Sequence, residues 1–278
     1  AGGHHFLVAG FAHDLLYLTR GVPVVYYGDE VGMTGSGDGT DKRARQDMFP
    51  TQVQDWQREE RIGSAPIGTR SSFAESTPIE TRLARLSSLR AQHPALASGA
   101  MITRLGSGGV LAVSRIDAAS RTEYVVAFNS GDAATTVTVP TSTPGTAWTP
   151  LLGGTSASTD PSGSMRLPIG PRSTVVLRAD APLPTPAAPS VTMRTSRDAI
   201  TGAYRLTATV PGADPSTVTF LVKRPGTDWA PLGSDDARPF RVFVPPGRGT
   251  VQVAAVVRDT AGQVAATAPQ RLAITPFQ

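Results

Sequence analysis

The sequence contains no cysteine, which excludes disulfides, thiolate catalysis and cysteine-based zinc sites. It also has no apolar run long enough to span a bilayer, so it predicts no membrane partner. The chain opens at Ala1 without a start methionine or a signal-peptide pattern. We therefore expect a processed or truncated start.

The sequence also lacks a stripe of basic residues. Residues 1–95 carry 10 Lys and Arg against 11 Asp and Glu, and residues 96–278 carry 16 against 11. The basic excess in the second part is scattered arginine with little aromatic interleaving, which argues against a nucleic-acid partner. The 278 residues suggest two or three domains, and 28 Gly with 24 Pro indicate turn-rich β structure in part of the chain.

The stretch Gly21–Glu30 is a run of β-branched and aromatic residues with glycine at both ends. This pattern predicts a strand buried on both faces, as in parallel sheets. Residues 5–20 precede it with apolar side chains at helical spacing: Leu7, Phe11, Leu15 and Leu18. A helix followed by such a strand is half of a βαβ unit, and its partner strands lie elsewhere in the chain or are missing from it.

Residues 31–76 show no periodic element, which is typical of a functional or flexible loop. Thr77-Pro78-Ile79-Glu80 is a capping box with proline at the first helical position, and it predicts a helix that ends at His93-Pro94. After Leu96 the pattern changes to short strands separated by turn residues. The predicted strands are 110–115, 122–128, 135–139 and 174–177 in a small antiparallel sandwich. Beyond a Pro/Ala linker they are 191–194, 204–210, 218–223, 240–244, 251–258 and 264–268 in a second.

Several motifs resemble the α-amylase family of glycoside hydrolases. Gly21–Met33 resembles the last barrel strand of that family, and Arg45–Phe49 resembles the loop that follows this strand in bacterial amylases. Residues 83–96 resemble the closing helix, and Val125–Asn129 resembles a core strand of the family's C domain. Together these motifs cover about residues 5–180 in the right order. The terminal region resembles an immunoglobulin-like accessory domain.

The resemblance implies an α/β fragment, the last part of a (β/α)8 barrel, followed by two all-β antiparallel sandwich domains. The expected boundaries are 1–95 for the barrel end, 96–180 for the amylase-type C domain, 181–190 for the linker and 191–278 for the immunoglobulin-like sandwich. The reaction implied is retaining cleavage of α-glucosidic bonds in starch-type glucans, which needs two carboxylates and a third acid that holds the substrate. The strands that carry these acids precede this segment, so we expect the segment alone to be inactive.

Asp41 and Arg45 are the candidate substrate-binding residues, because they follow the last strand on the catalytic side of a barrel. The alternative is a solvated loop with transient ion pairs. Asp29 and Glu30 are expected to be structural rather than catalytic. Core packing is the favoured interpretation for four aromatic residues: Tyr26, Tyr27, Trp148 and Trp229.

No catalytic residue, metal site or cofactor is expected in this segment. The run Asp38–Asp41 lacks the full ligand spacing of a calcium loop, and the resemblance assigns calcium to a domain of the longer enzyme outside this segment. The expected partners are an α-glucan polysaccharide or oligosaccharide and the missing N-terminal part of the barrel. The expected location is extracellular, in a bacterium. The alternative function is a non-catalytic α-glucan-binding or spacer module formed by the β domains.

Overall fold

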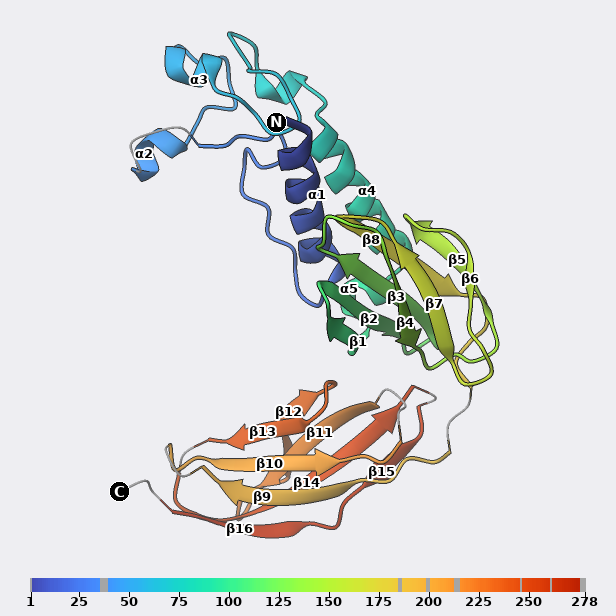
Figure 1. Cartoon of the computed structure of the whole chain (residues 1–278). Coiled ribbons are helices and arrows are strands. Elements are labelled where there is room, and N and C mark those ends of the chain that lie inside the picture. Colours follow the sequence, from blue (N-terminus) through green and yellow to red (C-terminus); the bar gives the residue numbers. More distant parts are fainter. Residues whose placement is uncertain are drawn as a thin grey trace.

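The computed structural model describes residues 2–35, 40–184, 187–198, 201–212, 216–245, 247–260 and 262–275. A helical region at the amino end packs on a first β sandwich, and a second β sandwich follows (Figure 1). No helix in the described part of the chain is long and apolar enough to cross a membrane.

Two long helices, α1 (Gly2–Leu18) and α4 (Pro78–Gln92), lie side by side in the helical region (Figure 1). The predicted capping box is confirmed, because Thr77 Oγ1 accepts from the Glu80 amide at 3.1 Å and Glu80 Oε2 accepts from the Thr77 amide at 3.3 Å. Asp14 of α1 is fully buried and accepts two hydrogen bonds from Arg82 of α4, at 2.8 and 2.5 Å. This ion pair and the apolar stripe of α4 hold the two helices together.

Two arginines bind the carboxyl end of α1, where backbone carbonyls have no partner within the helix. Arg90 donates to the carbonyl oxygens of Tyr17 and Gly21, and Arg115 Nη1 donates to that of Leu18 at 3.4 Å. Burial lowers the pKa of Arg115 to about 10, and the charges of Arg90 and Arg20 lower it as well. Arg115 stays protonated at neutral pH, so its charge complements the negative end of the helix dipole.

The strand predicted at Gly21–Glu30 is not formed. Residues 22–26 are extended without a ladder partner, and residues 27–32 form turns. Val22 is 86% exposed and Val24 is 78% exposed, while Tyr26 and Tyr27 are also exposed rather than in a core. The physical reason is that a parallel strand exists only with neighbours to pair with. The described residues of 2–95 contain helices, turns and the isolated bridge Arg61–Ser64, but no strand that could supply one.

The loop predicted at 31–76 is mostly irregular, but it contains three short helices that the sequence pattern did not show. They are α2 (Asp41–Ala44), α3 (Gln54–Arg58) and the 3-10 helix η1 (Ser72–Ala74). A further short helix, α5 (Ala95–Ser98), follows the end of α4 at His93.

The first sandwich contains all four strands predicted for it. They are β2 (Val110–Asp117), β3 (Thr122–Asn129), β4 (Thr135–Pro140) and β8 (Ser173–Ala179). The sequence prediction missed β1 (Ala100–Ser107), β5 (Ala147–Leu152), β6 (Ala157–Ser158) and β7 (Ser164–Ile169). A six-stranded sheet has the order β1-β2-β3-β8-β5-β6, and β4 pairs with β7 in a second sheet.

Helices cover one face of the six-stranded sheet, and the β4–β7 pair covers the other. Strand β3 shows this alternation: Tyr124, Val126 and Phe128 belong to the core cluster that includes α1 and α4, whereas Val125 and Ala127 belong to the cluster with β7. Phe128 meets Phe11 of α1 edge to face, with ring centroids 6.2 Å apart. The helical region and the first sandwich therefore share a hydrophobic core.

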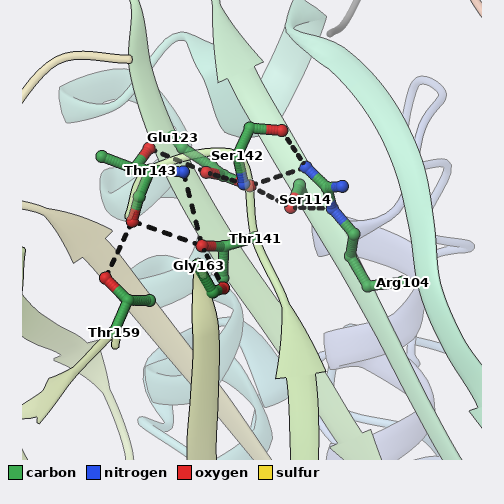
Figure 2. A network of polar contacts seen from close by, with 8 residues as sticks. All are labelled: Arg104, Ser114, Glu123, Thr141, Ser142, Thr143, Thr159 and Gly163. Atoms are coloured by element: carbon green, nitrogen blue, oxygen red, sulfur yellow. Dashed lines mark hydrogen bonds and ion pairs between the residues drawn. The ribbon is translucent and has the colours of Figure 1, made fainter. Parts of the chain in front are cut away.

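A buried polar network fixes one end of the first sandwich (Figure 2). The carboxylate of Glu123 is fully buried and accepts from Arg104 at 2.9 Å, from Ser114 Oγ at 2.5 Å, and from the Ser142 amide and Thr143 Oγ1, both at 2.8 Å. Four donors satisfy both carboxylate oxygens, so this buried charge is structural. Its partners come from β1, β2 and the loop after β4, which the network ties together.

The second sandwich has a three-stranded sheet, β13-β10-β9, and a second sheet in which β12-β11-β14-β15 is extended by β16. The strands are β9 (Thr192–Arg197), β10 (Tyr204–Thr209), β11 (Ser216–Lys223), β12 (Trp229–Asp235), β13 (Phe240–Val244), β14 (Gly249–Asp259), β15 (Val264–Ala266) and β16 (Gln270–Ile274). β12 and β16 were not predicted. Leu206, Phe220 and Val253 are fully buried in one cluster between the sheets.

Candidate functional site

The candidate site is the loop region that follows the extended segment 22–26. A tight turn at Gly28–Gly32 begins it. Gly28 has φ +96°, and the Gly28 amide donates to Glu30 Oε2 at 2.8 Å. The backbone carbonyl of Glu30 accepts from Thr77 Oγ1 at 2.5 Å. These bonds give Glu30 a structural role, as the sequence interpretation assigned, and they fasten the turn to the start of α4.

Asp41, at the start of the short helix α2, and Arg45, directly after its end, are brought together. Arg45 Nη2 lies 2.6 Å from Asp41 Oδ2, and Arg45 Nε donates to Asp41 Oδ1 at 3.1 Å. The two side chains are 74% and 58% exposed. An exposed ion pair of this kind contributes about 0–1 kcal/mol to stability. Both groups are thus accessible to a hydroxylated ligand, and each fixes the orientation of the other.

A polar chain that the sequence analysis did not identify connects the extended segment to this loop. The hydroxyl of Tyr27 donates to the backbone carbonyl of Gln46 at 3.1 Å, and the amide side chain of Gln46 donates to Glu59. Glu59 also accepts from Thr34 Oγ1 at 2.7 Å. These residues are separated by 13 to 25 positions with no periodic pattern, so no local sequence signal could have joined them.

A second polar cluster closes the far part of the loop around Glu75. The Glu75 carboxylate pairs with buried Arg61 and with Arg70, whose Nη1 lies 2.6 Å from Glu75 Oε1. Arg61 Nε also donates to the carbonyl oxygen of Ala65 at 3.0 Å. This long segment is therefore ordered by its own buried and half-buried polar groups rather than by regular secondary structure.

Aromatic side chains stand exposed along the same region. Phe49 and Phe73 are 68% and 65% exposed, with ring centroids 5.3 Å apart. Tyr26 and Tyr27 are 5.0 Å apart. Aromatic faces of this kind stack on apolar surfaces, including the C–H faces of sugar rings. The region therefore offers a carboxylate, a guanidinium and aromatic faces, but its described residues contain no buried carboxylate pair suited to acid and nucleophile roles.

Metal binding finds no support in the described residues, which contain no group of three or more His, Asp or Glu side chains close enough to hold an ion. In the segment 38–41, which was considered as a calcium loop, Asp38 and Gly39 lie outside the described residues. Of the two tryptophans predicted to lie in a core, Trp148 is 1% exposed and is a core residue as predicted. Trp229 is 37% exposed, so its core assignment was wrong. It lies on β12, at the edge of its sheet, where β11 is the one ladder partner among the described strands.

Comparison with known proteins gives one curated relative and several solved structures. The chain is 34% identical over 265 residues to an α-amylase of Streptomyces lividans, a match that covers 91% of this chain and 28% of the relative. An α-amylase of Geobacillus thermoleovorans, solved with acarbose, is 18% identical, with a TM-score of 0.48 over 64% of this chain and 34% of that chain. No family model matches.

A γ-CGTase of alkalophilic Bacillus clarkii is 16% identical and has a TM-score of 0.46 over 97% of this chain and 50% of that chain. The chain spans about a quarter of the length of the Streptomyces lividans relative. The sequence match to that relative confirms the resemblance to the α-amylase family of glycoside hydrolases that the motifs showed.

Proposed function

We propose that this chain is the C-terminal segment of a secreted bacterial glycoside hydrolase that cleaves α-glucosidic bonds in starch-type glucans with retention. The catalytic carboxylates would lie upstream, on barrel strands that precede residue 1. Residues 1–95 would then supply the last strand and helices of a (β/α)8 barrel. The homology to an α-amylase supports the glycoside hydrolase class.

The observation that carries the proposal is the exposed apolar segment 22–27. Val22 and Val24 are 86% and 78% exposed, although a run of this composition is typical of a strand covered on both faces. Leu7, Val8 and Leu16 of the neighbouring helix α1 are also exposed. Upstream barrel strands would pair with the unpaired backbone and cover these side chains, and the hydrophobic effect would drive that association.

In this arrangement Asp41 and Arg45 would lie near the carboxyl ends of the barrel strands, where the active sites of such barrels are built. The guanidinium of Arg45 would donate to sugar hydroxyls while Asp41 holds it in place. Asp41 would itself accept from a hydroxyl. No part of the chemistry is assigned to these two residues; their role is substrate binding.

The test is expression of this chain alone and within its complete reading frame. The chain alone is expected to release no reducing sugar from amylose. The complete protein is expected to hydrolyse amylose, with the α-anomer as the first product by NMR. Replacing Arg45 with Gln is expected to raise KM with little change in kcat. Arg172→Gln, which removes a half-buried guanidinium paired with exposed Asp132 on the first sandwich, is the control.

A complete protein that lacks activity on every α-glucan, or that yields the β-anomer first, would contradict the proposal. Activity of the chain alone would contradict the assignment of the catalytic carboxylates to an upstream segment. A normal KM in the Arg45→Gln variant would remove this residue from the substrate site and leave the rest of the proposal standing.

A further inference from the structure

A row of four side chains crosses the outer face of the larger sheet in the second sandwich. Lys223 of β11 pairs with Trp229 of β12 on one side and with Gln252 of β14 on the other, and Gln252 pairs with Arg271 of β16. Directly paired residues in an antiparallel sheet point to the same face. Their neighbours along the strands point into the core: Val222, Val253 and Leu272. The four polar and aromatic side chains therefore face solvent together.

A depression of about 360 Å³ lies beside this row, with Lys223, Arg224, Gln252 and Arg271 among its lining residues. The five-residue turn that closes it is fixed by Thr227, whose Oγ1 accepts from the Arg224 amide at 3.2 Å. None of the three cations has a carboxylate within 4.0 Å in the described part of the chain. Their charges are therefore free to act on a ligand.

The charge balance of the second sandwich favours an anion. Residues 191–278 hold 10 Lys and Arg against 6 Asp and Glu, so this domain carries a net charge of +4. Three of its acids are occupied elsewhere: Asp235 accepts from backbone amides, Asp236 pairs with Arg20, and Asp259 accepts from Gln263. Asp228, in the turn beside Trp229, is the acid nearest in sequence to the depression. Three cations and one acid leave a positive surface there.

We propose that this row binds an acidic glycan, a polysaccharide that carries carboxylate, sulfate or phosphate groups. Lys223, Arg224 and Arg271 would form charge-assisted hydrogen bonds with the anionic groups. The exposed ring of Trp229 would stack on a sugar face, and Gln252 would exchange hydrogen bonds with hydroxyls. Because neighbouring strands lie about 4.8 Å apart, the row spans roughly 14 Å and suits an extended chain of sugars.

The same features argue against two other ligands. A neutral glucan would leave three cations without an anionic partner. Single-stranded nucleic acid is held by several aromatic side chains on which successive bases stack, whereas this row has one ring. The proposal does not depend on the hydrolase function, because the second sandwich has its own hydrophobic core and its site shares no residue with the loop around Asp41.

Affinity electrophoresis of the whole chain in gels with polygalacturonate tests the proposal directly. The chain is expected to be retarded, and the retardation is expected to weaken as salt increases. The double variant Lys223→Gln/Arg271→Gln is expected to bind about tenfold or more weakly, and Trp229→Ala several-fold more weakly. Gels with amylose are expected to show no retardation that depends on these residues.

The matched control is Arg194→Gln/Arg241→Gln. These two exposed arginines flank Thr207 in the same cross-strand arrangement on the other sheet, so the control removes the same net charge without touching the depression. It is expected to change binding less than about twofold. Equal weakening in both double variants would overturn the proposal in favour of unspecific charge attraction. Equal affinity for amylose, or for an oligodeoxythymidylate, would overturn it in favour of a neutral glucan or a nucleic acid.

A second measurement keeps the test independent of variant folding. Titration of the unmodified chain with oligogalacturonate is expected to shift the NMR signal of the Trp229 indole N–H and to leave that of buried Trp148 in place. Shifts in both signals or in neither would contradict binding at this row.

Discussion

Two segments of similar composition differ in secondary structure and in exposure to solvent. Residues 22–27, Val-Pro-Val-Val-Tyr-Tyr, belong to no strand and are largely exposed. Residues 124–128, Tyr-Val-Val-Ala-Phe, form the middle of β3, where every side chain is at most 6% exposed. β3 has β2 on one side and β8 on the other. The comparison teaches that composition gives a segment its preference for a buried strand, while neighbouring strands decide whether it becomes one.

The largest expected effect comes from breaking the buried network that holds the second of these segments in its sandwich. Glu123→Ala leaves the Arg104 guanidinium buried without its carboxylate, which is expected to lower the free energy of unfolding by about 3–5 kcal/mol. Urea unfolding followed by tryptophan fluorescence measures it. Asp132→Ala is the matched control, because Asp132 is 77% exposed in its pair with Arg172 and is expected to change stability by at most about 1 kcal/mol.

The comparison of residues 22–27 with residues 124–128 can be tested directly by replacing one aromatic residue in each segment with alanine. Phe128→Ala removes a buried ring that packs on Phe11, so it is expected to cost about 3–5 kcal/mol. Tyr26→Ala removes a ring that is 59% exposed and is expected to cost at most about 0.5 kcal/mol. Thermal unfolding of both variants checks the pair. Similar losses would show that residues 22–27 are buried in solution.

The sequence predicted those parts of the fold that local chemistry determines. The helix after Thr77 was predicted because its capping box lies within four consecutive residues, and the strands β2, β3, β4 and β8 because they are short β-branched runs between turn residues. β1 and β7 were missed because glycine, arginine and proline interrupt their alternation. The exposure of Trp229 depends on its edge position, which no local pattern records.

The contacts of the candidate site also include some that the sequence could predict and some that it could not. The Asp41–Arg45 pair could be anticipated because the two residues lie only four positions apart in the sequence. The connections of Glu59 and Glu75 could not, because they join residues that come together only when the irregular loop folds. The row on the second sandwich depends on strand register, which brings Lys223, Gln252 and Arg271 together from three separate strands.

A smaller effect is expected at the cap of α4, which sharpens the contrast between the helical region and the sandwich. Thr77→Ala removes the cap to the Glu80 amide and the bond to the Glu30 carbonyl, and it is expected to cost about 1 kcal/mol. Thr77→Ser keeps the hydroxyl and is the control, with an expected change within about 0.5 kcal/mol. Hydrogen exchange in the first turn of α4 measures the local loss. Equal protection in both variants would contradict the role of the cap.

The smallest effect is a pH dependence at the junction of the two regions. Burial, and next the charge of Arg178, lower the pKa of His93 below its ordinary value of 6.5, and its Nδ1 lies 3.2 Å from the Tyr124 hydroxyl. The unfolded chain therefore takes up the proton first as pH falls. Stability is expected to decline as pH drops below about 6.5 and to level off below the folded pKa.

Denaturant unfolding between pH 7.5 and pH 5, compared between the unmodified chain and His93→Gln, checks this dependence. The variant is expected to show a shallower loss of stability over the same range. Identical slopes in the two proteins would show that His93 is not the group responsible.

The arginine pair at the end of α1 has a consequence for biosynthesis. Arg90 and Arg115 donate hydrogen bonds to the last carbonyls of a helix that ends at Leu18. The ribosome adds these two arginines about 70 to 100 residues after the carbonyls that they bind. A nascent chain that has emerged only through residue 90 carries α1 without the contact from Arg115. We therefore expect α1 to gain full protection from protease on the ribosome only after β2 has left the exit tunnel. Vectorial synthesis thus delays completion of the first helix until part of the sandwich behind it exists.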